Sequence, residues 1–562
     1  MALVCTVLAG ISVGALLSGF LWVGVALWVL AYIGVLLAVS VNDGGWLPPT
    51  LYGAFAPATV ILLVASVVLL VRTSAGPVFT VTVAVAIILA GLDGHLRRLN
   101  LYTGIRVSNL PGLEPRPRNT LLGRAYLAAA LLVPPVVFFA AVARILGVDP
   151  DGVGTSVTVG IVMIQAITAF GVIIDTYYRR RVSRAEYERL PEVLSEYAPR
   201  FVFYWDAPSG TAYQVGMWVP YLQRVGVPFF IMVRNPNTFE QAVSQSFGSP
   251  VILARTMQDM DRLVPETLTT AFYANNGMKN VHFVRYPQLV HIQLLHGDSD
   301  KASSYNPITA MFDRVYVAGQ AGIDRYVDHD VDIPLKKFRI VGRPQVEDIS
   351  GANGPIRDIA RPVVLYAPTW RGNYADASYA SIPVAPELFE RLLERGCQIL
   401  FRPHPYCYRD DEYRPIIADL HRRLEEHRAE TGIEHVYGEV AESEMSVVDC
   451  FNACDVMISD VSSVVVDFLY SEKPFALISM GKTVREFEAE FPLAKASYVM
   501  EEDRSNWAGA LASLLRDDPL ASQRSSMREH YLGDFPRNAY ADGFTKEARR
   551  EVARVPGSPK NG

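Results

Sequence analysis

The segment VMISDVSSVVVDFLY, Val456 to Tyr470, decides the fold expected for the second half of the chain. It begins with an apolar run typical of a buried strand and ends in a helical run from Val464 to Leu469. Ser462 and Ser463 stand where the N-cap of that helix belongs. A helix N-terminus carries unpaired N–H groups and partial positive charge, so this turn favours a phosphate that also binds the serine hydroxyls. Plain capping of the helix is the alternative.

Three other short motifs follow apolar runs in the same way, at His296-Gly297, Tyr366 to Trp370 and Arg402 to Pro405. In an open α/β sheet, the residues just beyond the carboxyl ends of the strands line the ligand crevice. No motif is specific alone, but their common placement predicts one site for a phosphorylated nucleotide donor.

His404 stands between Pro403 and Pro405, whose rings stiffen the backbone. Arg402 offers a planar fork that matches phosphate oxygens. A protonated His404 would stabilise charge that builds on a leaving phosphate. In the alternative, Arg402 pairs with an acid and His404 packs at the end of a strand.

His296 precedes Gly297, which lets the backbone approach the donor closely. A neutral imidazole at this position can take the proton of an attacking hydroxyl. A buried histidine satisfied by the backbone is the alternative. Asp298 and Asp300 follow, and they could hold Mg²⁺ or Mn²⁺ against a diphosphate, although two carboxylates are a thin ligand set.

Three more side chains complete the predicted donor site. Thr369 would contact the phosphate and Trp370 the base, unless Trp370 fills the core. Asp467, one helical turn beyond Ser463, accepts a bond from a donor hydroxyl or is an exposed helix acid.

Apolar runs alternate with helical patterns after the first third of the chain, as in βαβ units with a parallel sheet. A segment rich in Gly and Pro, residues 351–362, separates two such sets. The expected strands are residues 201–204, 229–233, 281–284, 292–295 and 315–317, then 363–366, 398–401, 456–459 and 475–478, with helices at 386–395, 413–426 and 464–470. We therefore predict a pair of Rossmann-like domains with a cleft between them.

The first third has the composition of a membrane module. Half of all residues are hydrophobic and 20% are charged, which is unusual for a wholly soluble protein. Residues 2–40 form an almost unbroken apolar stretch without the basic leader of a removable signal peptide. Further stretches lie at 51–71, 78–92, 125–146 and 157–174, of which 78–92 is short. We predict six spans, with five as the alternative.

Arginines set the expected orientation of these spans. They crowd the fourth connection at positions 97, 98, 106, 116, 118 and 124 and follow the last span at 179–181, whereas Asp149 and Asp151 lie in the connection between. Positive charge marks cytoplasmic loops, so the later domains are expected in the cytoplasm. Contact with an anionic lipid or substrate is the other role open to these arginines.

Charge and cysteine content exclude other classes. A net charge of −6 gives no support for nucleic acid as a partner. The five cysteines include no CxxC pair, which fits a reduced, cytosol-facing protein without a disulfide framework.

The order and content of the motifs resemble the CDP-glycerol glycerophosphotransferase family, the polymerases and primases of teichoic acid synthesis. The resemblance runs from about Phe201 to Leu515. It is carried by LLHGDSDK at 294–301, LYAPTWRG at 365–372, LFRPHP at 400–405 and SDVSSVVVDFLYSEKP at 459–474. By this resemblance His296 matches the proposed base and His404 the second essential histidine, while donor-binding positions are matched by Thr369, Trp370, Arg402, Ser462, Ser463 and Asp467.

The resemblance implies a GT-B-type fold and no required cofactor, with Mg²⁺ possible. It implies transfer of glycerol phosphate from CDP-glycerol, or of a related group from another CDP-alditol, to a hydroxyl of a membrane-lipid-linked acceptor, with release of CMP. Two segments depart from the family: Asp298-Ser299-Asp300-Lys301 replaces Thr-Pro-Leu-Lys, and Gly342-Arg343-Pro344-Gln345 replaces Gly-x-Pro-Arg, so that Arg343 would substitute for the missing arginine. Well-studied members attach peripherally to membranes, whereas this chain resembles a variant with its own multi-span module.

The expected organisation is a membrane module at residues 1–176, an acceptor-side domain at 177–345, a nucleotide-donor domain at 346–550 and a flexible tail at 551–562. The expected function is phosphoalditol transfer in the synthesis of a teichoic-acid-like cell-wall polymer at the cell membrane. One alternative is a GT-B glycosyltransferase that uses a nucleotide sugar. Another is a non-catalytic transporter or scaffold that senses a nucleotide, and the few charges within the spans weigh against transport.

Overall fold

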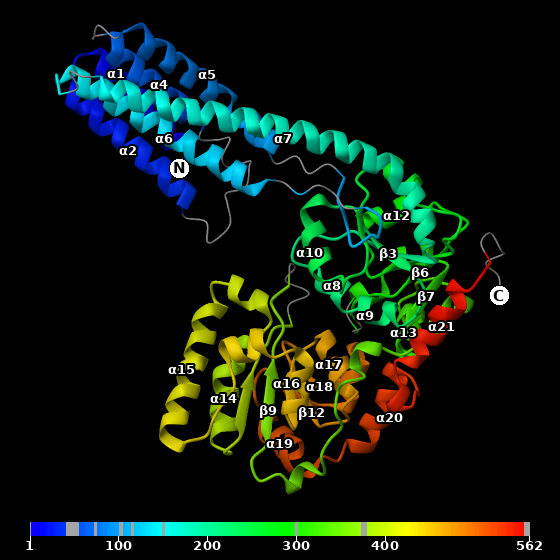
Figure 1. Ribbon diagram of the computed structural model, residues 1–562. Coiled ribbons are helices and arrows are strands. Elements are labelled where there is room, and N and C mark those ends of the chain that lie inside the picture. Colours follow the sequence, from blue (N-terminus) through cyan, green and yellow to red (C-terminus); the bar gives the residue numbers. More distant parts are fainter. Residues whose placement is uncertain are drawn as a thin grey trace. The chain divides into compact units, whose positions relative to one another are not determined.

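The computed structural model describes residues 2–40, 56–71, 76–100, 105–113, 117, 119–148, 152–297, 300, 302–372 and 379–555. The chain divides into two compact units. Met1–Arg106 and Gly112–Leu190 form a helical unit, and Val107–Pro111 and Pro191–Gly562 form an α/β unit (Figure 1). Asp298, Asp149, Asp151, Arg116 and Arg118, singled out from the sequence, lie outside the described residues.

The helical unit has a helix at each place where a span was expected. These are α1 (Ala2–Leu17), α2 (Leu21–Ser40), α4 (Ala56–Val71), α5 (Pro77–Asn100), α6 (Thr120–Ile145) and α7 (Val153–Tyr197). By length and composition α5, α6 and α7 could each cross a membrane, and shorter apolar helices cover Leu3–Leu17, Leu21–Val35 and Thr59–Val68. The short stretch at 78–92 is therefore part of a longer helix, which continues through Asp93 and Arg97.

The core of the helical unit is mainly aliphatic with a few aromatic side chains, and its outer faces are apolar. Trp28 stacks on Phe138 with ring centroids 4.2 Å apart, and its indole donates to the Leu62 carbonyl at 3.0 Å. Large apolar side chains such as Ile88 and Phe170 stand exposed on the outside. Exposed apolar faces of this kind suit contact with lipid tails or with a partner surface.

The first sheet of the α/β unit has the strand order β1-β4-β3-β2-β5-β6-β7-β8. The strands are β1 (Val107–Ser108), β2 (Phe201–Trp205), β3 (Phe229–Val233), β4 (Val251–Leu253), β5 (Thr270–Tyr273), β6 (Val290–Gln293), β7 (Arg314–Val317) and β8 (Phe338–Ile340). All neighbours are parallel except the edge strand β1, which runs antiparallel to β4. The helices of this part are α8 (Tyr213–Gly216), α9 (Val219–Gln223), α10 (Phe239–Ser244), α11 (Met257–Asp261), α12 (Val281–Val284) and α13 (Ala321–Asp328).

The second sheet has the order β10-β9-β11-β12-β13 and is parallel throughout. Its strands are β9 (Val363–Ala367), β10 (Gln398–Phe401), β11 (Val456–Ser459), β12 (Phe475–Ser479) and β13 (Tyr498–Glu501). The helices are α14 (Ala385–Leu393), α15 (Tyr413–Thr431), α16 (Val447–Ala453), α17 (Ser463–Leu469), α18 (Val484–Glu490), α19 (Trp507–Ala512), α20 (Ala521–Leu532) and α21 (Asp542–Val552). Two open, mainly parallel sheets fit the expected pair of Rossmann-like domains.

Helix α21 returns to the first sheet. Phe544, Ala548 and Val552 lie in the same buried cluster as the side chains of β2 and β3, and the Arg200 guanidinium donates to the Val552 carbonyl at 2.9 Å (Figure 1). The sequence placed this segment in the donor domain and began the tail at residue 551, whereas the structure gives the last helix to the acceptor side.

One expected strand is wrong. Residues 281–284, Val-His-Phe-Val, form the short helix α12 instead, because four alternating residues cannot separate a strand from one helical turn. The strand that pairs with β2 and β6 in the sheet is β5, which precedes α12 in the sequence. The expected strand 292–295 lies two residues earlier, as β6.

Candidate active site

The turn after β6 places His296 directly after a strained residue. Leu295 has a φ of 58°, a left-handed conformation that is uncommon outside Gly, Asn and Asp. The Leu295 carbonyl accepts a bond of 2.6 Å from the Trp218 indole. Its N–H donates to Gln293 Oε1 at 3.1 Å. These bonds hold the turn and fix the position of His296, and such strain is concentrated at functional sites.

His296 has the protonation expected of a general base. Its Nδ1 lies 2.8 Å from the Ala274 carbonyl oxygen, and because a carbonyl only accepts, Nδ1 carries the proton and Nε2 keeps the lone pair. Burial lowers the pKa of His296 below 6.5, against the opposing effect of the Ala274 bond, and the positive charge of Arg343 lowers it further. A neutral ring with an available Nε2 can accept a proton from a hydroxyl.

Gly297 brings the first half of the site to the second. A Cβ atom added at Gly297 would lie 3.7 Å from Ser463 Cβ, so the His296 turn and the start of α17 are in near contact. Ser462 is the N-cap of α17, but its side chain makes no capping hydrogen bond. The simple capping role considered from the sequence is therefore not what the Ser462 hydroxyl does here.

Arg343 and Asp467 form a second connection between the two sheets. The guanidinium grips the carboxylate through Nε and through Nη2, the latter at 3.0 Å from Oδ2. The Arg343 side chain is 9% exposed and that of Asp467 20%, so the pair is largely shielded from water. Asp467 was predicted to accept a bond from a donor hydroxyl, but here it binds Arg343. Arg343 is the residue proposed to replace the arginine that is missing from the Gly-x-Pro-Arg segment.

Asp460 is a buried organiser to which sequence reasoning gave no role. Its carboxylate is fully buried and accepts bonds from the Thr369 N–H at 2.9 Å, the Ser381 N–H at 3.0 Å and the Ser381 hydroxyl at 2.9 Å. It also lines a small pocket with Ser462 and Asp300. Asp460 therefore sets the loop that carries Thr369. In the sequence, the feature that could have indicated this role is the position of Asp460 between the strand β11 and the helix α17.

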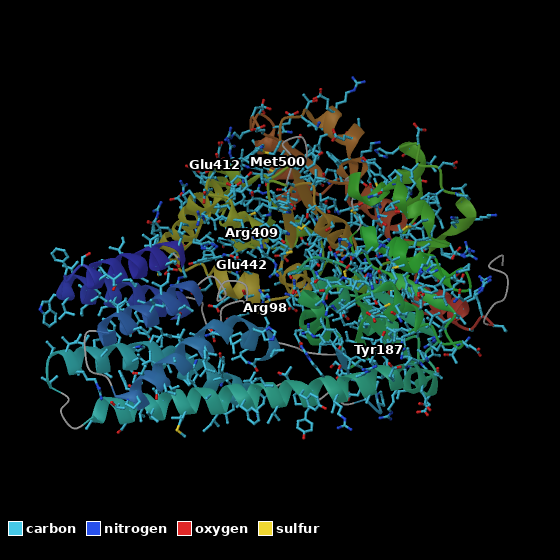
Figure 2. All side chains as sticks on the ribbon, turned by 90° about the horizontal axis from the view of Figure 1, so that it is seen from above. Arg98, Tyr187, Arg409, Glu412, Glu442 and Met500 are labelled. Atoms are coloured by element: carbon cyan, nitrogen blue, oxygen red, sulfur yellow. The ribbon has the colours of Figure 1, made fainter. Side chains whose placement is uncertain are left out.

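The side chains after β9 and β10 form an aromatic group. Trp370 stacks near His404 with ring centroids 6.2 Å apart and meets the edge of Tyr406 at 5.2 Å. The guanidinium of Arg409, labelled in Figure 2, lies 3.7 Å over the Tyr406 ring. Trp370 is only partly buried, so it does not simply fill the core, and such a group can take a flat base by stacking.

His404 is bonded in the opposite sense to His296. Its Nδ1 accepts a bond of 3.1 Å from the Tyr406 N–H, so in the neutral ring the proton sits on Nε2. The His404 side chain is exposed, and its backbone N–H donates to the Pro368 carbonyl at 3.1 Å. An N–H presented by a fixed ring can donate to a phosphate oxygen.

Arg402 is engaged in holding the chain. Its Nη1 donates to the carbonyls of Ala441 and Met445, the latter at 2.8 Å, at the π-helical turn Val440–Glu444. Glu442 of this turn, labelled in Figure 2, accepts a bond of 2.7 Å from the Tyr408 hydroxyl. Burial raises the pKa of Glu442, partly offset by that bond and by Arg402. A contact between Arg402 and phosphate stays a prediction.

Asp300 is bound within the protein. Its carboxylate lies 3.4 Å from Arg325 Nε and accepts a bond of 2.8 Å from the Tyr531 hydroxyl. Within the described part of the chain, no group of three or more His, Cys, Asp or Glu side chains could hold a metal ion. The metal role considered for Asp298 and Asp300 therefore stays a prediction without support from this geometry.

Comparison with known families gives a match to part of the chain. Residues 344–482 match the family CDP-Glycerol:Poly(glycerophosphate) glycerophosphotransferase. The similarity to that family covers about a quarter of the chain. The matched region contains the Thr369, Trp370, Arg402, His404 and Ser462-Ser463 motifs together with Asp467, whereas His296 and Gly297 precede it. The resemblance seen in the sequence is confirmed, and with it the expectation of a glycerophosphotransferase enzyme.

Solved structures similar to this chain share little sequence with it. The wall teichoic acid polymerase TagF is 12% identical over 67% of this chain and 96% of its own, with a TM-score of 0.39. A putative UDP-N-acetylglucosamine 2-epimerase from Listeria monocytogenes is 10% identical over 62% and 96%, with a TM-score of 0.41. A glycosyltransferase from Rickettsia africae is 12% identical over 63% and 98%, with a TM-score of 0.37. Scores this low carry no conclusion about activity. The curated proteins give no match.

Proposed function

We propose that the α/β unit transfers glycerol phosphate, or a related phosphoalditol, from a CDP-linked donor to a hydroxyl of a membrane-lipid-linked acceptor. The product would extend or prime a teichoic-acid-like polymer, with release of CMP. The observation that carries the proposal is the His296 turn: a neutral histidine with Nε2 available stands in near contact with the serine end of the glycerophosphotransferase region.

In the proposed reaction His296 Nε2 takes the proton of the acceptor hydroxyl. The acceptor oxygen forms a bond to the β-phosphorus of the donor, and the bond from that phosphorus to the bridging oxygen breaks. The electron pair leaves with CMP, whose new terminal oxygen is stabilised by the His404 N–H. Phosphoryl transfer needs positioning and charge stabilisation more than a covalent nucleophile, which this set of side chains offers.

The donor base is proposed to lie against Trp370, with Thr369, Ser462 and Ser463 near its phosphates. Asp460 supports this arrangement because it holds the Thr369 backbone. Mg²⁺ carried by the diphosphate stays a separate prediction, which addition of EDTA to the assay tests directly.

The helical unit is proposed to span the cell membrane several times, with the α/β unit in the cytoplasm. Strand β1, in the connection that carries the arginines between α5 and α6, pairs with β4 of the catalytic sheet. Among the described residues between β1 and β2, the elements are α6 and α7. Two crossings return a chain to the side on which it started, so this order agrees with one span for each helix and with the arginine bias.

CMP release from CDP-glycerol, measured with detergent-solubilised protein and membrane lipid extract, tests the function. CDP-ribitol and UDP-sugars are run in parallel to identify the donor. The control for a His296→Ala variant is His329→Ala, because His329 makes a similar bond from its ring to a carbonyl, at 2.9 Å, outside the site. CMP that needs lipid and His296 supports the proposal. UDP release from a sugar donor would make the protein a glycosyltransferase. Nucleotide binding without turnover in the wild-type protein, unchanged by His296→Ala, would make it a sensor.

A further inference from the structure

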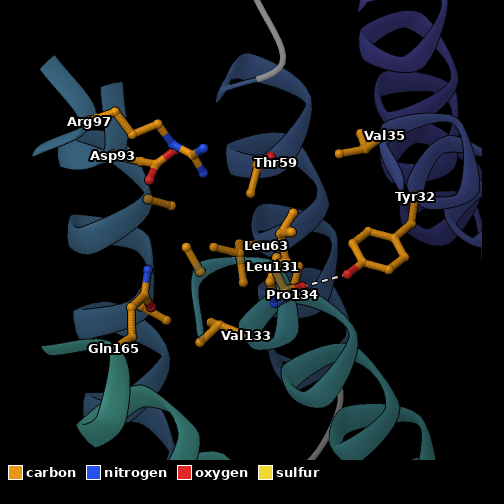
Figure 3. A pocket seen from close by; sticks show the side chains of 13 residues that line it. Tyr32, Val35, Thr59, Leu63, Asp93, Arg97, Leu131, Val133, Pro134 and Gln165 are labelled. Carbon is orange, nitrogen blue, oxygen red and sulfur yellow. Dashed lines mark hydrogen bonds and ion pairs between the residues drawn. The ribbon is translucent and has the colours of Figure 1, made fainter. Parts of the chain in front are cut away.

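Helices α2, α4, α5, α6 and α7 enclose a pocket in the helical unit, shown in Figure 3. Most of its lining is apolar, with side chains such as Leu63 and Val133. Polar groups from different helices also reach it, among them Tyr32, Thr59, Asp93, Arg97 and Gln165. Polar and ionised side chains between strongly apolar helices are costly and usually have a function.

One group in the pocket lacks a partner. The amide oxygen of Gln165 is buried without a hydrogen bond among the described residues, and the side chain is only 2% exposed. Such an acceptor costs free energy unless a donor from elsewhere satisfies it. The missing partner must bring an O–H or N–H group into the pocket.

The backbone of α6 borders the same pocket. Pro134 and Pro135 lie inside this helix and have no N–H to give to the carbonyls of Ala130 and Leu131. The Tyr32 hydroxyl satisfies the Leu131 carbonyl (Figure 3). Ala130, Leu131 and Pro134 all line the pocket, so the stretch of α6 that lacks two backbone N–H donors lies along it.

The charges in the pocket are already balanced. Arg97 Nε lies 2.6 Å from Asp93 Oδ2, and the Tyr126 hydroxyl donates to Asp93 Oδ1 at 2.7 Å. A ligand that carries a full charge would disturb this network, whereas a neutral hydroxyl would not. The space open to a water-sized group is about 20 Å³, which suits a single hydroxyl rather than a bulky head group.

We propose that this pocket binds the hydroxyl end of a neutral lipid alcohol. The hydroxyl donates to the Gln165 amide oxygen, and the attached apolar chain follows the apolar lining outward. A lipid is favoured over a soluble alcohol because the pocket and the outer faces of the unit are mainly apolar. The site is independent of the transfer reaction proposed above.

Photocrosslinking of the full chain in phosphatidylcholine nanodiscs tests the site. The probe is a diacylglycerol with a diazirine in one acyl chain, and its comparison is the same lipid with the hydroxyl converted to a methoxy group. Labelled peptides are mapped by mass spectrometry. One neutral hydrogen bond corresponds to a preference of about two- to tenfold for the hydroxyl probe on pocket peptides from α5, α6 and α7.

Gln165→Leu should lower labelling by the hydroxyl probe by about the same factor. Thr158→Val is the matched control, because Thr158 lies on the same helix and bonds the Gly154 carbonyl at 2.7 Å. Equal labelling by the two probes in the wild-type protein would overturn the proposal and leave a cavity for water alone, as would unchanged labelling of Gln165→Leu. His296→Ala should keep full labelling while it loses CMP release, which separates this site from the proposed reaction.

Discussion

At the scale of single residues, the two histidines of the site differ in which ring nitrogen the protein holds. His296 donates a hydrogen bond from its Nδ1–H to a carbonyl, whereas His404 accepts a hydrogen bond from a backbone N–H at Nδ1. The first is prepared to take a proton at Nε2 and the second to donate a hydrogen bond from Nε2. Two residues of one type are thus held in opposite hydrogen-bonding states, which fits the different roles that the sequence suggested for them.

His296→Ala should reduce kcat/KM for CMP release by about 10²- to 10⁴-fold, the usual contribution of a general base. Only the neutral ring can accept a proton, and the pKa of His296 is lowered. The acidic limb of the wild-type pH profile should therefore lie below pH 6.5. A limb at or above pH 6.5, or full activity in the variant, would remove His296 as the base, and His329→Ala should behave as the wild type.

Asp460→Asn should lower the free energy of unfolding by about 1–3 kcal/mol, because an NH₂ group would then face one of the N–H donors that the carboxylate now accepts. Urea unfolding followed by tryptophan fluorescence measures the change, and the KM for the donor should rise as the Thr369 loop shifts. Asp455→Asn is the control: that carboxylate accepts the Val363 N–H at 2.8 Å on the same sheet, away from the loop. Equal effects of both variants on KM would contradict the positioning role of Asp460.

Reasoning from the sequence selected site residues by their local context. His296, Gly297 and Ser463 were chosen because each follows an apolar run, and the structure brings Gly297 and Ser463 together. Asp460 could not be assigned in this way, since its partners Thr369 and Ser381 are distant in sequence. The binding of Arg402 to backbone carbonyls likewise depends on a turn that no local pattern reveals.

At the scale of elements, close packing of α20 fixes the turn after β7. A Cβ atom at Gly319 would lie 2.4 Å from the His530 carbonyl oxygen and 2.6 Å from the Tyr531 carbonyl carbon. Tyr531 also donates its hydroxyl to Asp300. A side chain at position 319 would therefore push the end of α20 away and disturb the hydrogen bond between Tyr531 and Asp300.

Gly319→Ala should destabilise the protein by about 1–3 kcal/mol, because the backbone of α20 has to move. The midpoint of urea unfolding measures this loss. Gly509→Ala, in helix α19 with open space around the added Cβ, should be neutral or slightly stabilising. If both substitutions had the same effect, close contact would not be the cause.

Element prediction from sequence worked best for strands that are nearly continuous apolar runs. The strands at 229–233, 398–401 and 456–459 have the predicted bounds, because continuous apolar runs of this length are typical of fully buried parallel strands. Strands β1, β4, β5, β8 and β13 were not predicted. They are short or mixed with polar residues, and their pairing comes from neighbours in space rather than from local pattern.

At the scale of the whole α/β unit, the Arg343–Asp467 pair joins the end of the first sheet to the helix after β11. A double-mutant cycle with Arg343→Gln and Asp467→Asn, read out in kcat/KM for CMP release, should give a coupling of about 0.5–3 kcal/mol. The exposed pair of Arg422 and Glu426 is the control, and its coupling should stay below about 0.5 kcal/mol. Additive effects of Arg343 and Asp467 would show that the two act separately.

The full chain should stay in the membrane fraction after an alkaline carbonate wash and be released only by detergent. The apolar lengths of α5, α6 and α7 are the reason, since about 20 apolar residues suffice to cross a bilayer. Western blotting of pellet and supernatant is the measurement, with a peripheral membrane protein as the control. Release by carbonate alone would indicate peripheral attachment.

Helix α21 has a consequence for the order in which the protein is made. The ribosome delivers β2 and β3 of the first sheet early, but Phe544, Ala548 and Val552, which complete their core, emerge only after the whole second sheet. Domains commonly fold as units during synthesis, so here the donor side can close while the acceptor side still waits for its final helix. A nascent chain stalled before residue 541 would have its second sheet complete, but the apolar side chains of the first sheet that contact α21 would be uncovered. Chaperones would be most needed while these side chains are uncovered.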